Sequence, residues 1–156
     1  MAGEIAMTMQ DLQFRTLTEL LSFDHPRIDR FKLELAKIDS SLPDNLPGID
    51  QLPRVAQERA VDFLLQSACF PSNMLSIELG RAGLLVMPKA WLVSQLREAI
   101  ARNGLLADDW AYRRLLEVVC KIDLNLVREL VEFGIDSSNE DIRDAAADCR
   151  EDLAAT

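Results

Sequence analysis

The sequence predicts an all-α protein of about eight short helices packed in antiparallel pairs. Three observations indicate this fold class: apolar residues recur at helical spacing, caps or prolines precede most of the apolar segments, and Asn or Gly ends several of them. The chain has 156 residues, 49% hydrophobic and 28% charged, as in an ordinary globular protein. We expect one helical domain over residues 1–156, with a flexible N-terminus at about residues 1–8.

The N-terminal third is predicted to hold two helices and a long connection. The first helix covers about residues 9–21, and Pro26 stands in the first turn of the second, where its missing N–H is harmless. This second helix runs to about Ile38. Residues 39–53 contain three prolines and a glycine, so we expect a Pro-rich loop that is longer than most connections between helices.

The middle of the chain contains one clear helix and one ambiguous segment. Residues 54–70 carry apolar side chains on two sides, which predicts a central helix covered on both. In the following stretch, about 73–87, residues 75–79 alternate as in a strand, whereas Leu84 extends a helical pattern. We favour a helix, and a strand remains the alternative.

Four further helices are predicted from their end signals. Pro88 opens one that stops at the pair Asn103 and Gly104, and Asp108 or Asp109 caps the next.

The final two helices follow directly. Asp123 caps the first of them and Gly134 closes it, while Ser137 and Glu140 form a capping box for the last. Short helices joined by tight turns are typical of paired-helix repeats.

Some segments resemble known helical families. Residues 37–42 and 121–126 share K-I-D-x-x-L, at a separation about twice the roughly 40 to 47 residues of a HEAT repeat. Residues 139–146, N-E-D-I-R-D-A-A, resemble the second helix of HEAT-like repeats. With residues 109–117 and 134–137, they are similar to small helical immunity proteins that accompany bacterial toxins. The resemblance covers the last third and implies a HEAT-like α-α superhelical stack, with an irregular helical bundle as the alternative.

The charge is concentrated near the C-terminus. Of the formal net charge of −9, residues 1–104 carry −2 and residues 105–156 carry −7. An acidic surface repels nucleic acid and anionic lipid, so we expect neither a nucleic-acid nor a membrane partner, and favour a protein with a basic surface. Glu4 stands where a signal peptide needs positive charge, which predicts a cytoplasmic protein.

Residues suited to catalysis or metal binding are scarce. His25 is the only histidine, and Cys69, Cys120 and Cys149 are far apart in apolar stretches, where a thiol acts as a small hydrophobic group. Zinc sites need paired Cys or His at short spacing. We therefore predict no catalytic residues, no cofactor and no metal.

The predicted last helix carries an acidic stripe. Its members recur three or four residues apart and so share one face: Asp141, Asp144, Asp148 and Asp152. Like charges at this spacing cost about 0.2 to 0.5 kcal/mol per pair. The stripe is interpreted either as a solvated outer face or as a contact for a basic partner, and a metal site is the third possibility.

A second candidate surface lies on the predicted sixth helix. Trp110 and Arg114 are four residues apart, and Arg113 stands beside them. Tryptophan and arginine dominate the binding energy of many interfaces. The alternative is that Trp110 packs on a neighbouring helix, with Arg114 on its ring and Arg113 paired to Glu117.

These observations predict a non-catalytic protein-binding module. An immunity-type inhibitor that covers a basic surface of a toxin is favoured by the acidic C-terminal third and by the resemblance. The alternative is a helical scaffold or adaptor subunit, and a third hypothesis is an enzyme that uses acidic residues. The oligomeric state and the binding face are left open.

Overall fold

The computed structural model describes residue 9 and residues 12–70 and 73–155, and in this part of the chain the structure is helical without any strand. The predicted all-α class is therefore confirmed, whereas the predicted flexible N-terminus at residues 1–8 lies outside the described residues. The α-helices are α1 Leu17–Leu21, α2 Pro26–Ile38, α3 Arg54–Cys69, α4 Met74–Leu85, α5 Lys89–Arg102, α6 Asp109–Val119, α7 Leu124–Ile135 and α8 Glu140–Ala154.

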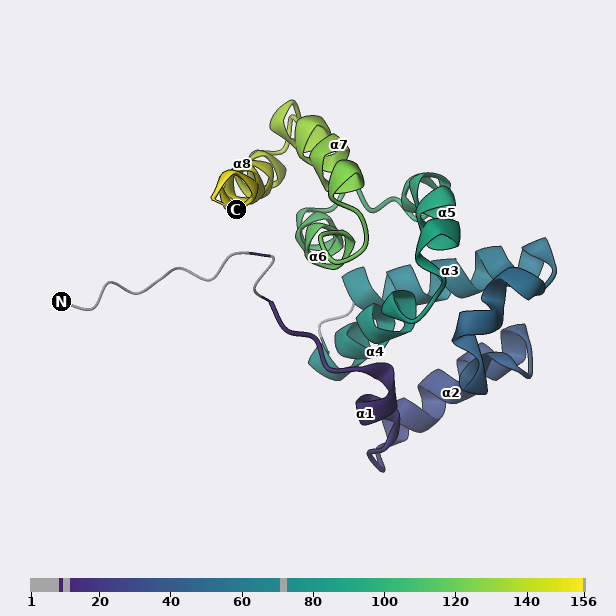
Figure 1. The fold of residues 1–156 in the computed structure, drawn as a ribbon. Coiled ribbons are helices and arrows are strands. Elements are labelled where there is room, and N and C mark those ends of the chain that lie inside the picture. The colour runs from purple at the N-terminus through teal and green to yellow at the C-terminus, as the bar shows by residue number, and fades with distance from the viewer. Residues whose placement is uncertain (1–8, 10–11, 71–72, 156) are drawn as a thin grey trace.

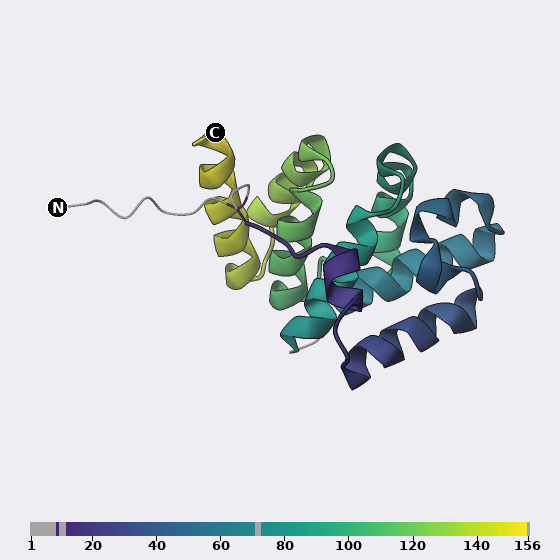
Figure 2. The ribbon, with the colours of Figure 1, turned by 60° about the horizontal axis from the view of Figure 1, so that its bottom comes forward.

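The helices are arranged from α2 at one end of the molecule to α8 at the other, with α3 and α4 between them (Figures 1 and 2). Neighbouring helices pack antiparallel where the contacts define it: Gly80 of α4 faces Ala68 of α3, and Gly83 faces Leu64, one turn earlier in α3. A connected cluster of buried apolar side chains runs through all of these helices. In the described part of the chain, every helix is too short or too polar to cross a bilayer.

The predicted helix over residues 9–21 is wrong in its first half, because α1 contains only Leu17–Leu21. Thr16 caps it, its side chain accepting a hydrogen bond from the backbone N–H of Glu19 at 3.2 Å. Residues 12–15 have no regular secondary structure and make contacts outside their own segment. The Phe14 ring lies 4.5 Å from the guanidinium carbon of Arg81 in α4, a tertiary contact that sequence periodicity does not reveal.

The predicted loop over residues 39–53 is more ordered than expected. It contains two short 3₁₀ helices, η2 Leu42–Asp44 and η3 Leu46–Gln51, each with a proline in its first turn. Leu42, Leu46 and Ile49 are fully or almost fully buried in the core. Prolines exclude an α-helix interior here but are compatible with these tight turns, in which the leucines and the isoleucine gain hydrophobic burial.

Residues 73–87 form a helix, as favoured, and the strand alternative is wrong. Asn73 caps α4, its side-chain oxygen accepting from the backbone N–H of Ser76 at 3.1 Å. From Leu79 to Leu84 every residue is buried, so the helix is covered nearly all round. That burial explains the ambiguous pattern, because a helix that is apolar on several sides has no clear stripe.

The ends of the C-terminal helices mostly match the expected signals. Asp108 and Asp123 cap α6 and α7, and Gly104, after α5, has the left-handed φ of 65°. The capping box of Ser137 and Glu140 is wrong by two residues. Asn139 caps α8 instead, accepting from the backbone N–H groups of Asp141 and Ile142, while Ser137 accepts from the N–H of Asn139.

A buried tyrosine joins α6 to α7. The Tyr112 hydroxyl donates a 2.6 Å hydrogen bond to the carbonyl oxygen of Leu130, and the side chain is fully buried. Gly134 leaves the space that this phenol occupies, because a Cβ there would collide with the Tyr112 ring. The bond fixes the position of α7 against α6 and thereby sets the surface described next.

Candidate functional site

Trp110 is exposed on the first turn of α6. Asp108 holds this helix start, its Oδ1 accepting from the backbone N–H of Ala111 at 2.9 Å. The Trp110 side chain is 65% exposed, the highest fraction among the exposed aromatic residues of the described chain. It is therefore not packed beneath a neighbouring helix, and an apolar ring of this size is available to a partner.

Arg113 brings the two predicted surfaces together. Its Nη1 lies 3.9 Å from Oδ2 of Asp148 on α8, so the outer sides of α6 and α8 are adjacent. Both side chains remain exposed, and a pair this long in solvent contributes little to stability. The expected alternative partner of Arg113, Glu117, pairs with Arg81 of α4 instead.

The acidic stripe on α8 is exposed over most of its length. Asp141, Asp144 and Asp148 face solvent. Asp152 is half-buried, because its Oδ2 accepts a 3.3 Å hydrogen bond from the backbone N–H of Met9. Three carboxylates of the stripe are thus accessible to a partner, with Asp148 also in the long pair with Arg113, whereas the fourth bonds to Met9.

A hollow of about 540 Å³ lies where the start of α6, the end of α7 and the start of α8 meet. Its lining includes Leu106 and Ala107 before α6, Phe133 on α7 and Ile142 on α8. Trp110 follows Ala107 by three residues in the chain but is not one of the residues that line the hollow. We define the C-terminal surface as Trp110, Arg113, Phe133, Asp144 and Asp148.

Sequence reasoning missed one member of this surface. Phe133 is 49% exposed at the C-terminal end of α7. No signal in the sequence could have found it, because position 133 follows Leu126 and Leu130 at seven and three residues, a spacing that predicts burial on the apolar stripe. Its exposure is decided by where α7 ends relative to the neighbouring helices.

Arg114 faces the interior rather than the C-terminal surface. It is half-buried, and its charge acts on Cys69 of α3 and on Arg81 of α4. The Arg81 side chain is only 9% exposed, pairs with Glu117 and lies under the Phe14 ring, with its Nε unbonded within the described residues. Burial lowers the pKa of Arg81, and the Glu117 carboxylate opposes that change. The charge of Arg114 thus acts on this buried cluster, whereas Arg113 reaches Asp148 on the outer side of α8.

The cysteines are buried thiols. Desolvation raises the pKa of Cys69 and of Cys149 to about 12, with the Arg81 charge partly opposing it at Cys69. Cys120 is also buried, and its pKa is raised for the same reason. A thiol that retains its proton is a weak nucleophile.

The raised pKa values of these thiols predict that the protein loses stability at alkaline pH. Unfolded cysteines ionise near pH 8.5, whereas Cys69 and Cys149 stay protonated up to about pH 12 in the fold, so the unfolded state binds fewer protons in that window. The free energy of unfolding should therefore be unaffected by the thiols below about pH 8 and fall above pH 9, by up to about 1.4 kcal/mol per pH unit for each thiol. Urea unfolding at pH 8 and pH 10.5 measures this. A Cys149→Ala variant should show a smaller fall, and an equal fall would contradict the assignment.

Comparison with protein-family models, with curated protein sequences and with solved structures gives no match. Within residues 9, 12–70 and 73–155, no group of three or more His, Cys, Asp or Glu side chains is placed to hold a metal ion. The site is therefore described by its own geometry. Helices α6, α7 and α8 carry exposed aromatic rings at Trp110 and Phe133, a hollow lined in part by Phe133, and a row of carboxylates on α8.

Proposed function

We propose that this chain is a protein-binding module whose C-terminal surface takes up a basic region of another protein. The observation that supports it most is the 65% exposed indole of Trp110 on α6, the helix whose Arg113 contacts Asp148 of the acidic stripe on α8. An exposed aromatic ring is a large apolar contact that a partner side chain can cover, and tryptophan is enriched among the residues that dominate binding free energy.

The charges around Trp110 support a basic partner. Asp144 and Asp148 are exposed on α8, and the segment from residue 105 to the C-terminus carries a formal charge of −7. Carboxylates at the rim of an interface act over a Debye length of about 8 to 10 Å and raise the rate of encounter with a positive surface. The aromatic residues would then contribute most of the binding free energy, since rim charges contribute less to it.

An immunity-type inhibitor is the specific form of this function that we propose. Such a protein binds its target in a stoichiometric complex and covers the target's active surface. The resemblance of residues 139–146 and 109–117 to helical immunity proteins motivates the proposal, together with the acidic field. The residues that carry it are Trp110 and Phe133 as apolar contacts, Arg113 as a polar contact, and Asp144 and Asp148 as steering charges.

The proposal is tested by capture with the intact chain and with a D144K/D148K variant. The wild-type protein is immobilised and incubated with an extract of its source cells. It should retain a basic protein in a one-to-one complex. The charge reversal should slow association with that purified protein by about tenfold at low salt and flatten its salt dependence. Association rates at several salt concentrations measure this, and W110A should instead raise the dissociation rate.

The matched control reverses two exposed carboxylates elsewhere. D44K/D50K makes the same change in net charge, on η2 and η3, far along the chain from α8. Association equally slow in both variants would show a general charge effect and contradict a local surface. An inhibitor suppresses the activity of the captured protein, whereas a scaffold leaves it active and joins it to a further subunit in size-exclusion chromatography.

A further inference from the structure

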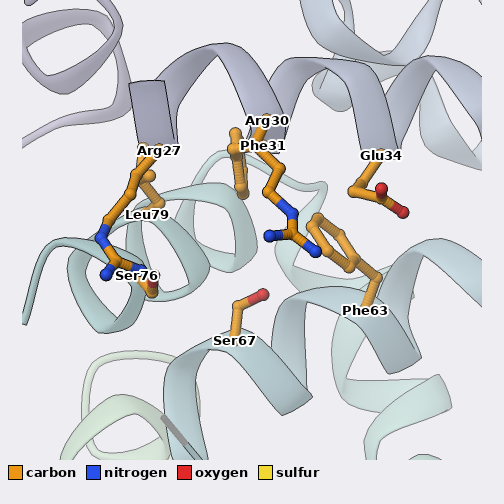
Figure 3. A pocket seen from close by; sticks show the side chains of 8 residues that line it. All are labelled: Arg27, Arg30, Phe31, Glu34, Phe63, Ser67, Ser76 and Leu79. Carbon is orange, nitrogen blue, oxygen red and sulfur yellow. The ribbon is translucent and has the colours of Figure 1, made fainter. Parts of the chain in front are cut away.

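A second pocket, of opposite charge, lies in the N-terminal half of the molecule between α2, α3 and α4 (Figure 3). It encloses about 190 Å³. Arg27 and Arg30 come from α2, three residues apart and thus on one face of the helix, and Figure 3 shows both guanidinium groups pointing toward the side where Ser67 and Ser76 lie. The two arginines and two hydroxyls therefore converge on one space.

Within the described residues, the positive charge of this pocket is offset only in part, by the Glu34 carboxylate that also lines it. Among the described residues, neither Arg27 nor Arg30 forms an ion pair with a carboxylate. The acidic residue at the rim, Glu34, is engaged by Lys37, whose Nζ lies 3.0 Å from its Oε1. Two unpaired guanidinium groups thus face one pocket in a chain of net charge −9. Arginine forks bind carboxylates and phosphates through paired N–H donors.

The floor of the pocket is apolar and continues along α3. Phe31 of α2 and Phe63 of α3 lie with their ring centres 5.6 Å apart, and Leu79 of α4 completes the floor. A second hollow, of about 370 Å³, shares Phe63, Ser67 and Ser76 with the pocket and extends to Phe70, which is 49% exposed. Together they form a groove with a cationic end at α2 and an aromatic end at Phe70.

We propose that this groove binds a peptide segment of a partner that carries an anionic side chain beside an apolar one. The carboxylate or phosphate group of the peptide sits between Arg27 and Arg30, and the hydroxyls of Ser67 and Ser76 donate to its remaining oxygens. The apolar side chain lies on Phe63 and Phe70. The site is separate from the C-terminal surface, has the opposite sign of charge, and does not depend on the function proposed there.

The size of the pocket indicates a side chain rather than a whole cofactor. A buried cavity of about 150 Å³ holds one benzene ring, whereas sites for drug-sized ligands span about 300 to 1,000 Å³. At about 190 Å³ the cationic end takes one anionic group, and the adjoining hollow takes the next side chain of an extended chain. Recognition of acidic or phosphorylated motifs by clustered arginines is a general mode of peptide binding.

The proposal is tested by selecting, from a displayed library of random peptides, those that bind the intact protein. We expect the selected sequences to be enriched in Asp or Glu next to an aromatic or aliphatic residue. A fluorescein-labelled copy of the best peptide should bind at least about tenfold more weakly to R27Q/R30Q, measured by fluorescence anisotropy, because its charge-assisted hydrogen bonds are lost. Replacing the acidic residue by its amide should have the same effect on the wild-type protein.

Two further arms distinguish the sources of the anion. If a phosphoserine version of the peptide binds more tightly than the carboxylate version, phosphate is the preferred group; if inorganic phosphate competes as well as the peptide, the site is one for a free anion and the peptide proposal is overturned.

The control variant is K89Q/R128Q, which removes two exposed positive charges from α5 and α7 and should leave peptide affinity within twofold. Arg27 and Arg30 are exposed and form no ion pair with the residues that the structure describes, so R27Q/R30Q should keep the circular dichroism spectrum and the melting temperature of the wild type. The inference is also overturned if no peptide is selected, if the selected peptides lack acidic residues, or if R27Q/R30Q and K89Q/R128Q weaken binding equally. A failure of this kind leaves the D144K/D148K result unaffected, because that surface lies on α8.

Discussion

Replacing Glu117 with alanine is expected to lower the free energy of unfolding by about 3 kcal/mol. The change removes the charge partner of Arg81, whose side chain is only 9% exposed between α4, α6 and the Phe14 ring. A guanidinium group that is largely withdrawn from water and loses its nearest carboxylate retains most of the cost of desolvation. Equilibrium urea unfolding, followed by circular dichroism at 222 nm, measures the loss.

The matched control for Glu117 is an exposed ion pair. Arg97 and Glu129 lie 2.6 Å apart with half of each side chain in solvent, so Glu129→Ala should cost less than about 1 kcal/mol. Changing Arg81 and Glu117 together to methionine should recover most of the stability, because neither charge then stays buried alone. If Glu117→Ala were as mild as Glu129→Ala, the Arg81 pair would not be the buried contact described above.

Replacing Gly80 with alanine is expected to destabilise the protein by about 3 kcal/mol, although alanine is the better helix former by about 1 kcal/mol. A Cβ at Gly80 would lie 2.7 Å from the carbonyl oxygen of Leu64 and 2.9 Å from the Cα of Ala68. Both are backbone atoms of α3, so relief requires α3 and α4 to move apart. Thermal and urea unfolding of the variant measure the cost.

Gly83, one turn later in the same helix, provides the control for Gly80. A Cβ there would meet the methyl groups of Leu64, the nearest at 2.6 Å, and a side chain can shift where a backbone cannot. Gly83→Ala should therefore cost clearly less than Gly80→Ala, by about 2 kcal/mol. Equal losses for both variants would contradict a close backbone approach at Gly80.

Local signals predicted most helix ends because capping is a contact between near neighbours in the chain. Asp108, Asp123 and the pair Asn103 and Gly104 satisfy or terminate backbone groups within a few residues of themselves, and the structure places them as expected. The cap of α8 shows the limit of such signals. Several polar residues stand together there, and Asn139 rather than Ser137 takes the role.

The N-terminal errors have a different cause. Residues 12–15 have the composition of a helix but are not helical, because Phe14 gains a contact with Arg81 and Arg15 bonds with Glu78 of α4. In residues 39–53, buried leucines stabilise 3₁₀ turns that the prolines alone do not predict. The conformation of each segment therefore depends on contacts with helices elsewhere in the chain.

The two proposed binding surfaces also differ in how much of each could be predicted from the sequence. The sequence singled out Trp110, Arg113 and the acidic stripe of α8, and the structure brings Arg113 next to Asp148. The sequence did not single out Phe133. It also did not indicate the pocket of Arg27 and Arg30, whose lining residues come from three helices.

By itself, the sequence determined the helical class, most helix boundaries and the acidity of the C-terminal third, because spacing, capping and charge are properties of neighbouring residues. Only the tertiary structure decided which polar groups are buried, which aromatic rings stay exposed and which side chains share a pocket. These depend on how closely helices approach one another, as Gly80 against α3 shows, and that approach is set by packing between residues distant in the chain.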